Sequence, residues 1–213
     1  MISKNKFNQK VTSLGRKENI RDQKKPRMLI VCEGEKTEPN YFIQFKESIR
    51  DNLLVFIDGT GKNTLSLVDY AIEQVEIAVQ ERENFNMVWV VFDRDSFSTQ
   101  DFNEAVSLAK RKKFNVAYSN EAFELWYLLH FDYIDSALSR YQYEKMLTER
   151  LSFKYVKNSK DMFDKLLARQ ETAIRNAERL LASYPNPNPE TDNPSTTVHK
   201  LVIQLNGYRN SNH

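Results

Sequence analysis

Several residue types are scarce in this chain of 213 residues. It has one cysteine, Cys32, and three histidines. A single cysteine excludes an internal disulfide and a zinc site built from cysteines, and three histidines make a histidine-rich metal site improbable. Five glycines and six prolines are too few for a collagen-like or linker-like chain. Any metal chemistry is therefore expected to use carboxylate ligands.

Long hydrophobic runs are also missing. The longest, Met28–Cys32 and Met87–Phe92, are far shorter than the roughly 20 residues that span a bilayer. The first residues are polar and basic, without the apolar stretch of a secretory signal. Hydrophobic residues make up 40% of the chain and charged residues 28%, which is typical of a soluble globular protein. We therefore expect a cytoplasmic protein of roughly one to one and a half domains, with no membrane partner.

The small net charge of +2 hides an asymmetry along the chain. Residues 1–27 carry nine Lys and Arg against two acids, so the rest of the chain is net acidic. Residues 1–26 are predicted to form a flexible basic arm, in which Lys24 and Lys25 are candidate nucleic-acid contacts. The alternative is a solvated segment that only aids solubility.

Strands and helices alternate through the first half of the chain. Strands are predicted at 27–32, 53–57, 87–92 and 114–118, and helices at 39–50, 64–83, 100–112 and 121–131. The strands are apolar throughout instead of alternating, which indicates a parallel sheet covered on both faces. Residues 27–134 are thus predicted to be an α/β core with a sheet of about four strands flanked by helices.

The rest of the chain, residues 135–213, is predicted to be a helical extension packed on that core. Apolar residues recur at helical spacing in 141–151 and 159–183. A proline-rich loop at 185–194 follows, and Ser195–Thr197 is expected to cap a last helix.

Acidic residues follow the ends of the predicted strands. Glu33 ends the first, Asp58 the second, and Asp93 and Asp95 the third. Parallel strands place such residues at one edge of the sheet, where open α/β sheets bind ligands. Converging carboxylates repel one another unless a cation lies between them, and oxygen ligands select Mg²⁺ or Mn²⁺. Phosphoryl transfer or phosphodiester hydrolysis is the chemistry that follows. The alternative is that single acids, such as Asp95, only cap the next helix.

These segments resemble a known fold and a known family. Ile30–Gly34 (IVCEG) and Val90–Asp95 (VVFDRD) resemble the Glu-Gly and Asp-x-Asp signatures of the TOPRIM fold. Val31–Phe42, Ser119–Phe131 and Pro194–His199, in this order, resemble the RloB-like family. The resemblance extends from about residue 27 to 206.

The resemblance implies a prokaryotic TOPRIM-type nuclease of phage defence and abortive infection. It implies that Glu33 is the acid/base and a metal ligand, and that Asp93 and Asp95 hold Mg²⁺ or Mn²⁺. Phe97 stands where many TOPRIM sequences have a third acid, which puts a second metal site in doubt. The substrate is expected to be RNA, with tRNA first, or DNA. The alternative is a non-catalytic nucleic-acid-binding protein or a partner subunit of a defence system.

Three polar residues lie in the helical motifs of the family. Glu124 interrupts an apolar helix and is a candidate catalytic residue, or else a satisfied buried group. His130, in the same helix, is a candidate nucleic-acid contact, with a structural role as the alternative. His199 is a candidate catalytic residue through phosphate binding or proton donation, although a lone histidine there is also typical of a solvent-facing position.

Two basic residues lie beside the predicted acids. Lys36 is a candidate catalytic residue that contacts the scissile phosphate, or it pairs with Glu35 or Glu38. Arg94, between the two aspartates, is a candidate nucleic-acid contact or a partner in a salt bridge.

Overall fold

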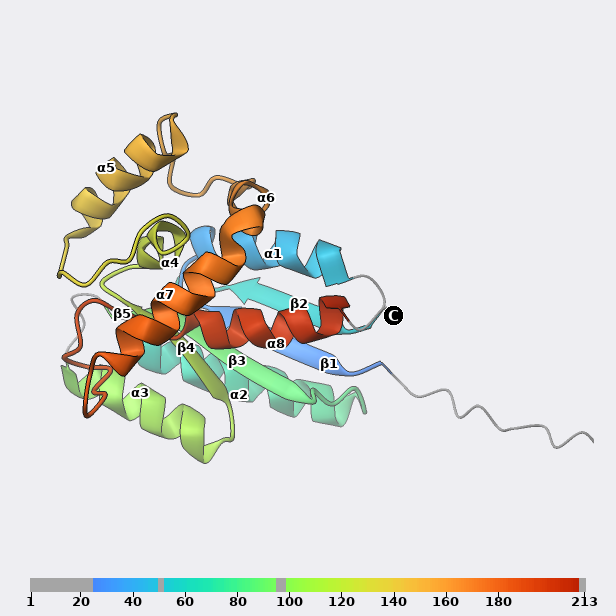
Figure 1. Ribbon diagram of the computed structural model, residues 1–213. Coiled ribbons are helices and arrows are strands. Elements are labelled where there is room, and N and C mark those ends of the chain that lie inside the picture. The colour runs from blue at the N-terminus through green and yellow to red at the C-terminus, as the bar shows by residue number, and fades with distance from the viewer. Residues whose placement is uncertain (1–24, 50–51, 95–98, 211–213) are drawn as a thin grey trace, which may run out of the picture.

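A computed structural model describes residues 25–49, 52–94 and 99–210. Its centre is a sheet of five strands in the order β2-β1-β3-β4-β5 (Figure 1). The strands are β1 (Arg27–Cys32), β2 (Leu54–Gly59), β3 (Met87–Asp93), β4 (Asn115–Asn120) and β5 (Ser195–Thr196). The first four run parallel, and only β5 is antiparallel to its neighbour β4. The predicted α/β fold is thus confirmed, with one strand more than expected, and the architecture is consistent with a TOPRIM-like fold.

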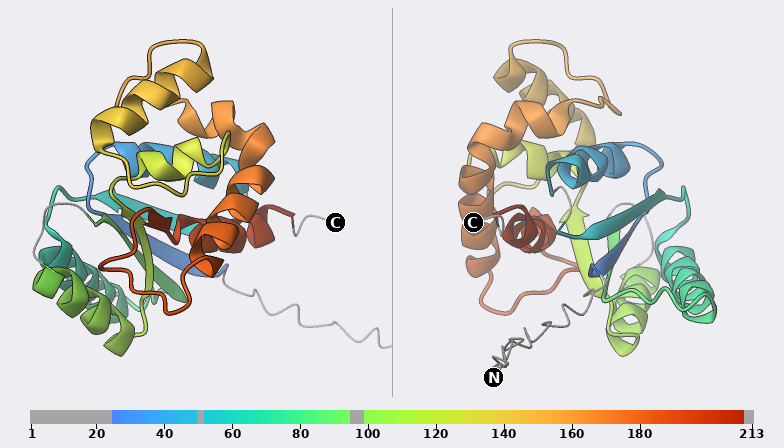
Figure 2. Two further views of the ribbon diagram at one scale, coloured as in Figure 1. Left: turned by 60° about the vertical axis from the view of Figure 1, so that its left-hand side comes forward. Right: turned by 90° about the vertical axis from the view of Figure 1, so that its right-hand side faces the viewer.

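The order of the strands reverses between β1 and β3. From β1 the chain passes through α1 (Thr37–Ile49) to β2 on one side. It then returns through α2 (Thr64–Gln80) to β3 on the other side of β1. The two helices cover opposite faces of the sheet (Figure 2). Ligands of open α/β sheets bind at such a reversal, beyond the carboxyl ends of the strands.

Each face of the sheet has its own hydrophobic core. On one face, Leu29, Val31 and Val90 pack under α2 and α3 (Thr99–Arg111). On the other face, alternate residues of the same strands, such as Ile30 and Val91, belong to a larger core with α1 and the helices that follow β4. Burial on both faces explains why these strands are apolar at every position.

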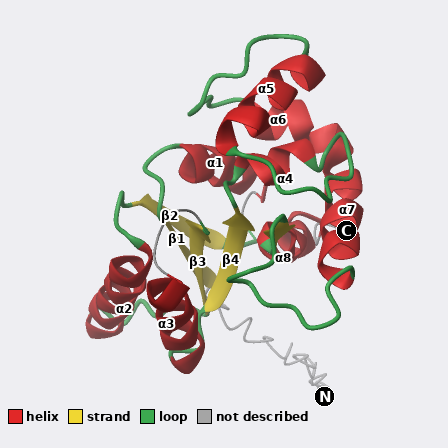
Figure 3. Cartoon of the chain, turned by 90° about the vertical axis from the view of Figure 1, so that its left-hand side faces the viewer, coloured by secondary structure: helices red, strands yellow, loops and turns green. Residues whose placement is uncertain are grey.

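The remaining helices gather on the α1 side of the sheet (Figure 3). They are α4 (Glu124–Leu128), α5 (Arg140–Leu151), α6 (Met162–Leu166), the 3-10 turn η1 (Leu167–Arg169), α7 (Gln170–Ala182) and α8 (Val198–Asn210). Helix α8 lies against the sheet, where Trp89 Nε1 donates to Gln204 Oε1 at 2.6 Å. The extension therefore packs on the core as predicted. No helix in the described ranges is long and apolar enough to cross a membrane.

Three predicted elements differ from the structure. The helix expected at 121–131 is regular only in α4, because the backbone at residues 130 and 131 hydrogen-bonds three residues back. The helix expected at 159–183 is divided, because Phe163 in α6 packs on Phe45 whereas Gln170 in α7 accepts from Asn206 of α8. The expected cap at 195–197 includes the short strand β5, since its backbone pairs with the end of β4.

Candidate active site

A pocket of about 360 Å³ lies beyond the carboxyl ends of β1 and β3. It is formed by the loop after β1 and the start of α1, by the end of β3, by the start of α4, and by two segments of the helical extension. The lining residues are Glu33, Gly34, Glu35, Lys36, Thr37, Glu38, Asp93, Phe123, Glu124, Arg140, Lys157 and Asn158. Core and extension therefore build the pocket together.

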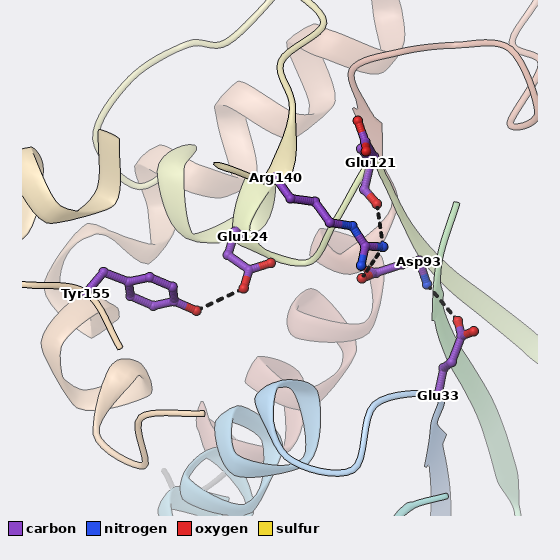
Figure 4. Close-up of polar contacts among 6 residues, drawn as sticks. All are labelled: Glu33, Asp93, Glu121, Glu124, Arg140 and Tyr155. Carbon is purple, nitrogen blue, oxygen red and sulfur yellow. Dashed lines mark hydrogen bonds and ion pairs between the residues drawn. The ribbon is translucent and has the colours of Figure 1, made fainter. Parts of the chain in front are cut away.

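Glu33 joins the ends of the two central strands. Its backbone N–H donates to Val91 O at 2.8 Å. Its carboxylate Oε2 accepts the backbone N–H of Asp93 at 3.1 Å (Figure 4). The two acids that the sequence singled out at these strand ends thus lie side by side.

Three further acids, Glu35, Glu38 and Glu124, line the same pocket. Burial raises the pKa of Asp93 well above its ordinary value, and the negative charges of Glu38, Glu124 and Glu33 raise it further, while Arg140 acts in the opposite direction. Burial also raises the pKa of Glu38, with a contribution from Glu124. The negative charges of Glu33, Glu38 and Glu124 therefore oppose the ionisation of Asp93, and the pocket favours a bound cation or proton.

Glu38 is a site residue that the sequence reasoning considered only as a partner for Lys36. It lies buried in the first turn of α1, and its carboxylate fills the space where a side chain at Gly34 would start. Gly59 at the end of β2 is needed for a similar reason, since the ring of Pro39 and the backbone of Gly34 lie where its Cβ would be. The short Glu-Gly-x-x-x-Glu spacing is the sequence signal that connects the glycine with this second acid.

Glu124 has a buried partner from the extension. The hydroxyl of Tyr155 donates to Glu124 Oε1 at 3.0 Å, and both residues are buried (Figure 4). Burial and the charge of Glu124 raise the pKa of Tyr155, so the phenol stays protonated and remains a donor. The structure thus places Glu124 at the pocket as expected and also shows it as a satisfied buried group.

The cations of the pocket come from three segments. Lys36 lines the pocket as expected, and Arg140 and Lys157 line it from the extension. The Arg140 guanidinium lies with Nη2 at 3.6 Å from Asp93 Oδ2 and donates to Glu121 O at 3.4 Å (Figure 4). Arg140 is the first residue of α5, and a capping box between Ser139 and Gln142 sets the start of this helix. Sequence reasoning missed Arg140 and Lys157 because both are far along the chain from the acidic motifs.

Four predicted nucleic-acid or metal contacts lie elsewhere or are not described. The Arg94 guanidinium lies over the ring of Phe102 at 5.6 Å, on the α3 side of the sheet. Lys25 precedes β1 and is therefore at the opposite end of a six-residue strand, about 20 Å from the pocket. Asp95 and Lys24 fall outside the described residues.

Both described histidines are buried away from the pocket lining. His130 is 1% exposed, with Nδ1 at 2.9 Å from Trp126 O, and burial lowers its pKa to about 4. His199 is 3% exposed, and burial, with the charge of Lys200, lowers its pKa to about 4. The expectation that His130 contacts nucleic acid is corrected, because its ring is enclosed by the core beside Trp126. His199 is placed in the core at the start of α8 and does not join the described lining of the pocket.

The sequence model of the family described as RloB-like protein matches residues 28–205. The chain belongs to the RloB-like family. No curated protein and no solved structure matches it. The RloB-like match runs through the core and the helical extension, and so it includes every described residue that lines the pocket.

The donor chemistry of this RloB-like pocket suits a hard divalent cation. Its acids offer only oxygen ligands, and burial together with the neighbouring negative charges raises the pKa of Asp93. Within the described part of the chain, no three Asp, Glu, His or Cys side chains are grouped as one metal site. Of the three predicted ligands, Glu33 and Asp93 are described and lie together, so they are the residues of this pocket that would hold an ion.

Proposed function

We propose that this RloB-like protein is a Mg²⁺- or Mn²⁺-dependent nuclease. It hydrolyses phosphodiester bonds of RNA, with tRNA the first candidate, or of DNA, and acts in the cytoplasm of a prokaryotic cell in defence against phage. The observation that carries this proposal is the meeting of five acidic residues with Lys36, Arg140 and Lys157 in one pocket. Acids that share a cation, next to bases that bind phosphate, are the groups that phosphodiester hydrolysis requires.

The residues divide into two sets of roles. Asp93, Asp95 and Glu33 hold the metal ion, which supplies water activation and charge neutralisation at the phosphate. Glu33 also serves as acid/base, because its carboxylate lies at the strand end beside Asp93. Lys36, from the loop after β1, and Lys157, from the extension, bind phosphate oxygens in the pocket.

A cleavage assay with matched variants tests this function. The purified full chain is incubated with total tRNA, single-stranded RNA, plasmid and single-stranded DNA, each with Mg²⁺, Mn²⁺ or EDTA. Asp93→Asn removes one pocket carboxylate, whereas Asp132→Asn removes an acid that pairs with Arg150 outside the pocket. We expect metal-dependent cleavage that is lost in Asp93→Asn and retained in Asp132→Asn. Cleavage that persists in EDTA, or in Asp93→Asn, would refute the proposed role of the acids.

One observation favours a second candidate, a nucleic-acid-binding partner subunit without catalysis. The acids of the described residues are not grouped as a metal site, and Asp93 already has a cationic partner in Arg140. Binding of nucleic acid without cleavage, at any metal concentration and by correctly folded protein, would support this alternative. The same assay therefore separates the two functions.

A further inference from the structure

Asp93 is contacted by a cation from the helical extension. The Arg140 guanidinium is 3.6 Å from Asp93 Oδ2. The same guanidinium donates to the carbonyl oxygen of Glu121 at 3.4 Å. Arg140 thus neutralises the carboxylate that the proposed function assigns to the metal ion.

A divalent cation bound at Asp93 and this guanidinium would repel each other and compete for the same carboxylate. A metal–oxygen bond is about 2.0–2.1 Å for Mg²⁺, so the two positive groups would lie within a few ångströms of each other. The side chain of Arg140 is 37% exposed and starts at the first residue of α5, so it has room to turn toward the pocket. A displaced guanidinium would bind a phosphate held by the lysines of the same pocket, because guanidinium binds phosphate through paired hydrogen bonds.

We propose that Arg140 exchanges between Asp93 and the phosphate of the substrate, and that the divalent cation drives the exchange. This inference rests on the proposed nuclease function and adds a positioning residue from the extension to it. Without substrate, Arg140 competes with the cation for Asp93. With the cation bound, Arg140 holds the phosphate over the acids. Productive substrate binding is thereby coupled to occupation of the metal site.

The exchange predicts effects of opposite sign in one variant. Arg140→Ala removes the competitor, so Mn²⁺ should bind roughly two- to fivefold more tightly, as expected when a partly exposed ion pair is lost. The same variant loses a phosphate contact, so the KM for nucleic acid should rise about tenfold or more. Arg140→Lys keeps a positive charge near Asp93 without the paired donors, so Mn²⁺ affinity should stay near wild type while the KM still rises.

Calorimetric titration of the full chain with Mn²⁺ measures the first effect without reference to activity. Arg150→Ala is the matched control, because it removes an arginine from the same helix whose ion pair is with Asp132, outside the pocket. It should leave Mn²⁺ affinity unchanged. Arg140→Gln, which keeps a donor for Glu121 O, provides a second charge-removing variant if Arg140→Ala does not fold.

The outcomes separate this inference from the proposed function. Mn²⁺ binding to the wild type with equal or weaker binding to Arg140→Ala and Arg140→Gln overturns the exchange and leaves the nuclease proposal standing. Tighter binding with an unchanged KM also overturns it, because Arg140 would then only occupy the metal site. Absence of Mn²⁺ binding in the wild type and in all variants refutes the nuclease proposal itself.

Discussion

Acidification from pH 7 to pH 5 should destabilise the fold through its two buried histidines. The pKa values of His130 and His199 are about 4 in the folded chain, against 6.5 for an unperturbed side chain. The unfolded state therefore binds protons below pH 6.5 that the folded state does not bind. The stability that the neutral rings provide is complete above pH 6.5 and is lost as the pH falls toward 4.

The expected size of this effect follows from the shift. A difference of one pKa unit corresponds to about 1.4 kcal/mol, so at pH 5 each histidine costs about 2 kcal/mol and the pair about 4 kcal/mol. Asp93 and Glu38 act in the opposite sense, because their pKa values are raised by burial and protonation relieves their repulsion. The pH dependence of the wild-type unfolding free energy is therefore the sum of opposing contributions from the histidines and the acids.

Urea denaturation of the wild type and of a double variant, at pH 5, 6 and 7, isolates the histidine contribution. His130→Asn and His199→Gln leave polar, neutral side chains at the two positions, and His130→Asn offers an amide N–H to the carbonyl of Trp126. The difference in unfolding free energy between the two proteins should change by about 4 kcal/mol between pH 7 and pH 5. Parallel pH dependence of the two proteins would refute the reasoning, because the rings would then titrate as in the unfolded chain.

Four other predictions concern the pocket and the residues around it. Tyr155→Phe removes a buried hydrogen bond to a carboxylate and should lower the unfolding free energy by about 1.5–3 kcal/mol, seen as a lower Tm in a thermal melt. Gly59→Ala places a Cβ against backbone atoms and should lower the unfolding free energy in urea denaturation by about 1–3 kcal/mol. In Gly34→Ala the nearest atoms to the new Cβ belong to the end of the Glu38 side chain, so this variant should keep the fold and lose nuclease activity. Unchanged activity would contradict a role for Glu38. Asp93→Asn should stabilise the protein by about 1 kcal/mol at pH 7, a gain that disappears as the pH falls below the raised pKa of Asp93; equal stability at every pH would count against the repulsion.

The α/β core could be predicted because its local and long-range signals agree. Strands β1 and β3 are continuously apolar between their charged end residues Arg27 and Asp93. They are separated by helices with one apolar face, a pattern that indicates a parallel sheet covered on both faces. The strand β5 could not be predicted. It has two residues, Ser195 and Thr196, and it exists because the end of β4 pairs with it across the fold.

The candidate site was predictable where a strand end or a family motif marks it. Glu33 and Asp93 were placed together because parallel strands align their carboxyl ends. Arg140, Lys157 and Tyr155 come from the extension, and only the packing of that extension on the core brings them to the pocket. The burial of His130 and His199 could not be predicted, because a polar residue type in a family motif does not reveal whether its side chain is enclosed by the core.

The packing of α8 has a consequence for folding during synthesis. Gln204 and Thr197 bond to Trp89 and Tyr118 of the sheet, yet they are made roughly 80 residues after the core strands are complete. At about 5–20 residues per second, the part of the sheet that α8 covers stays without this helix for about 4–16 s during synthesis. A nascent chain of this protein therefore presents an apolar surface to chaperones. Tyr155 and Lys157 are also made after the strands and after Glu33 and Asp93, so the pocket is completed only once the extension has been added.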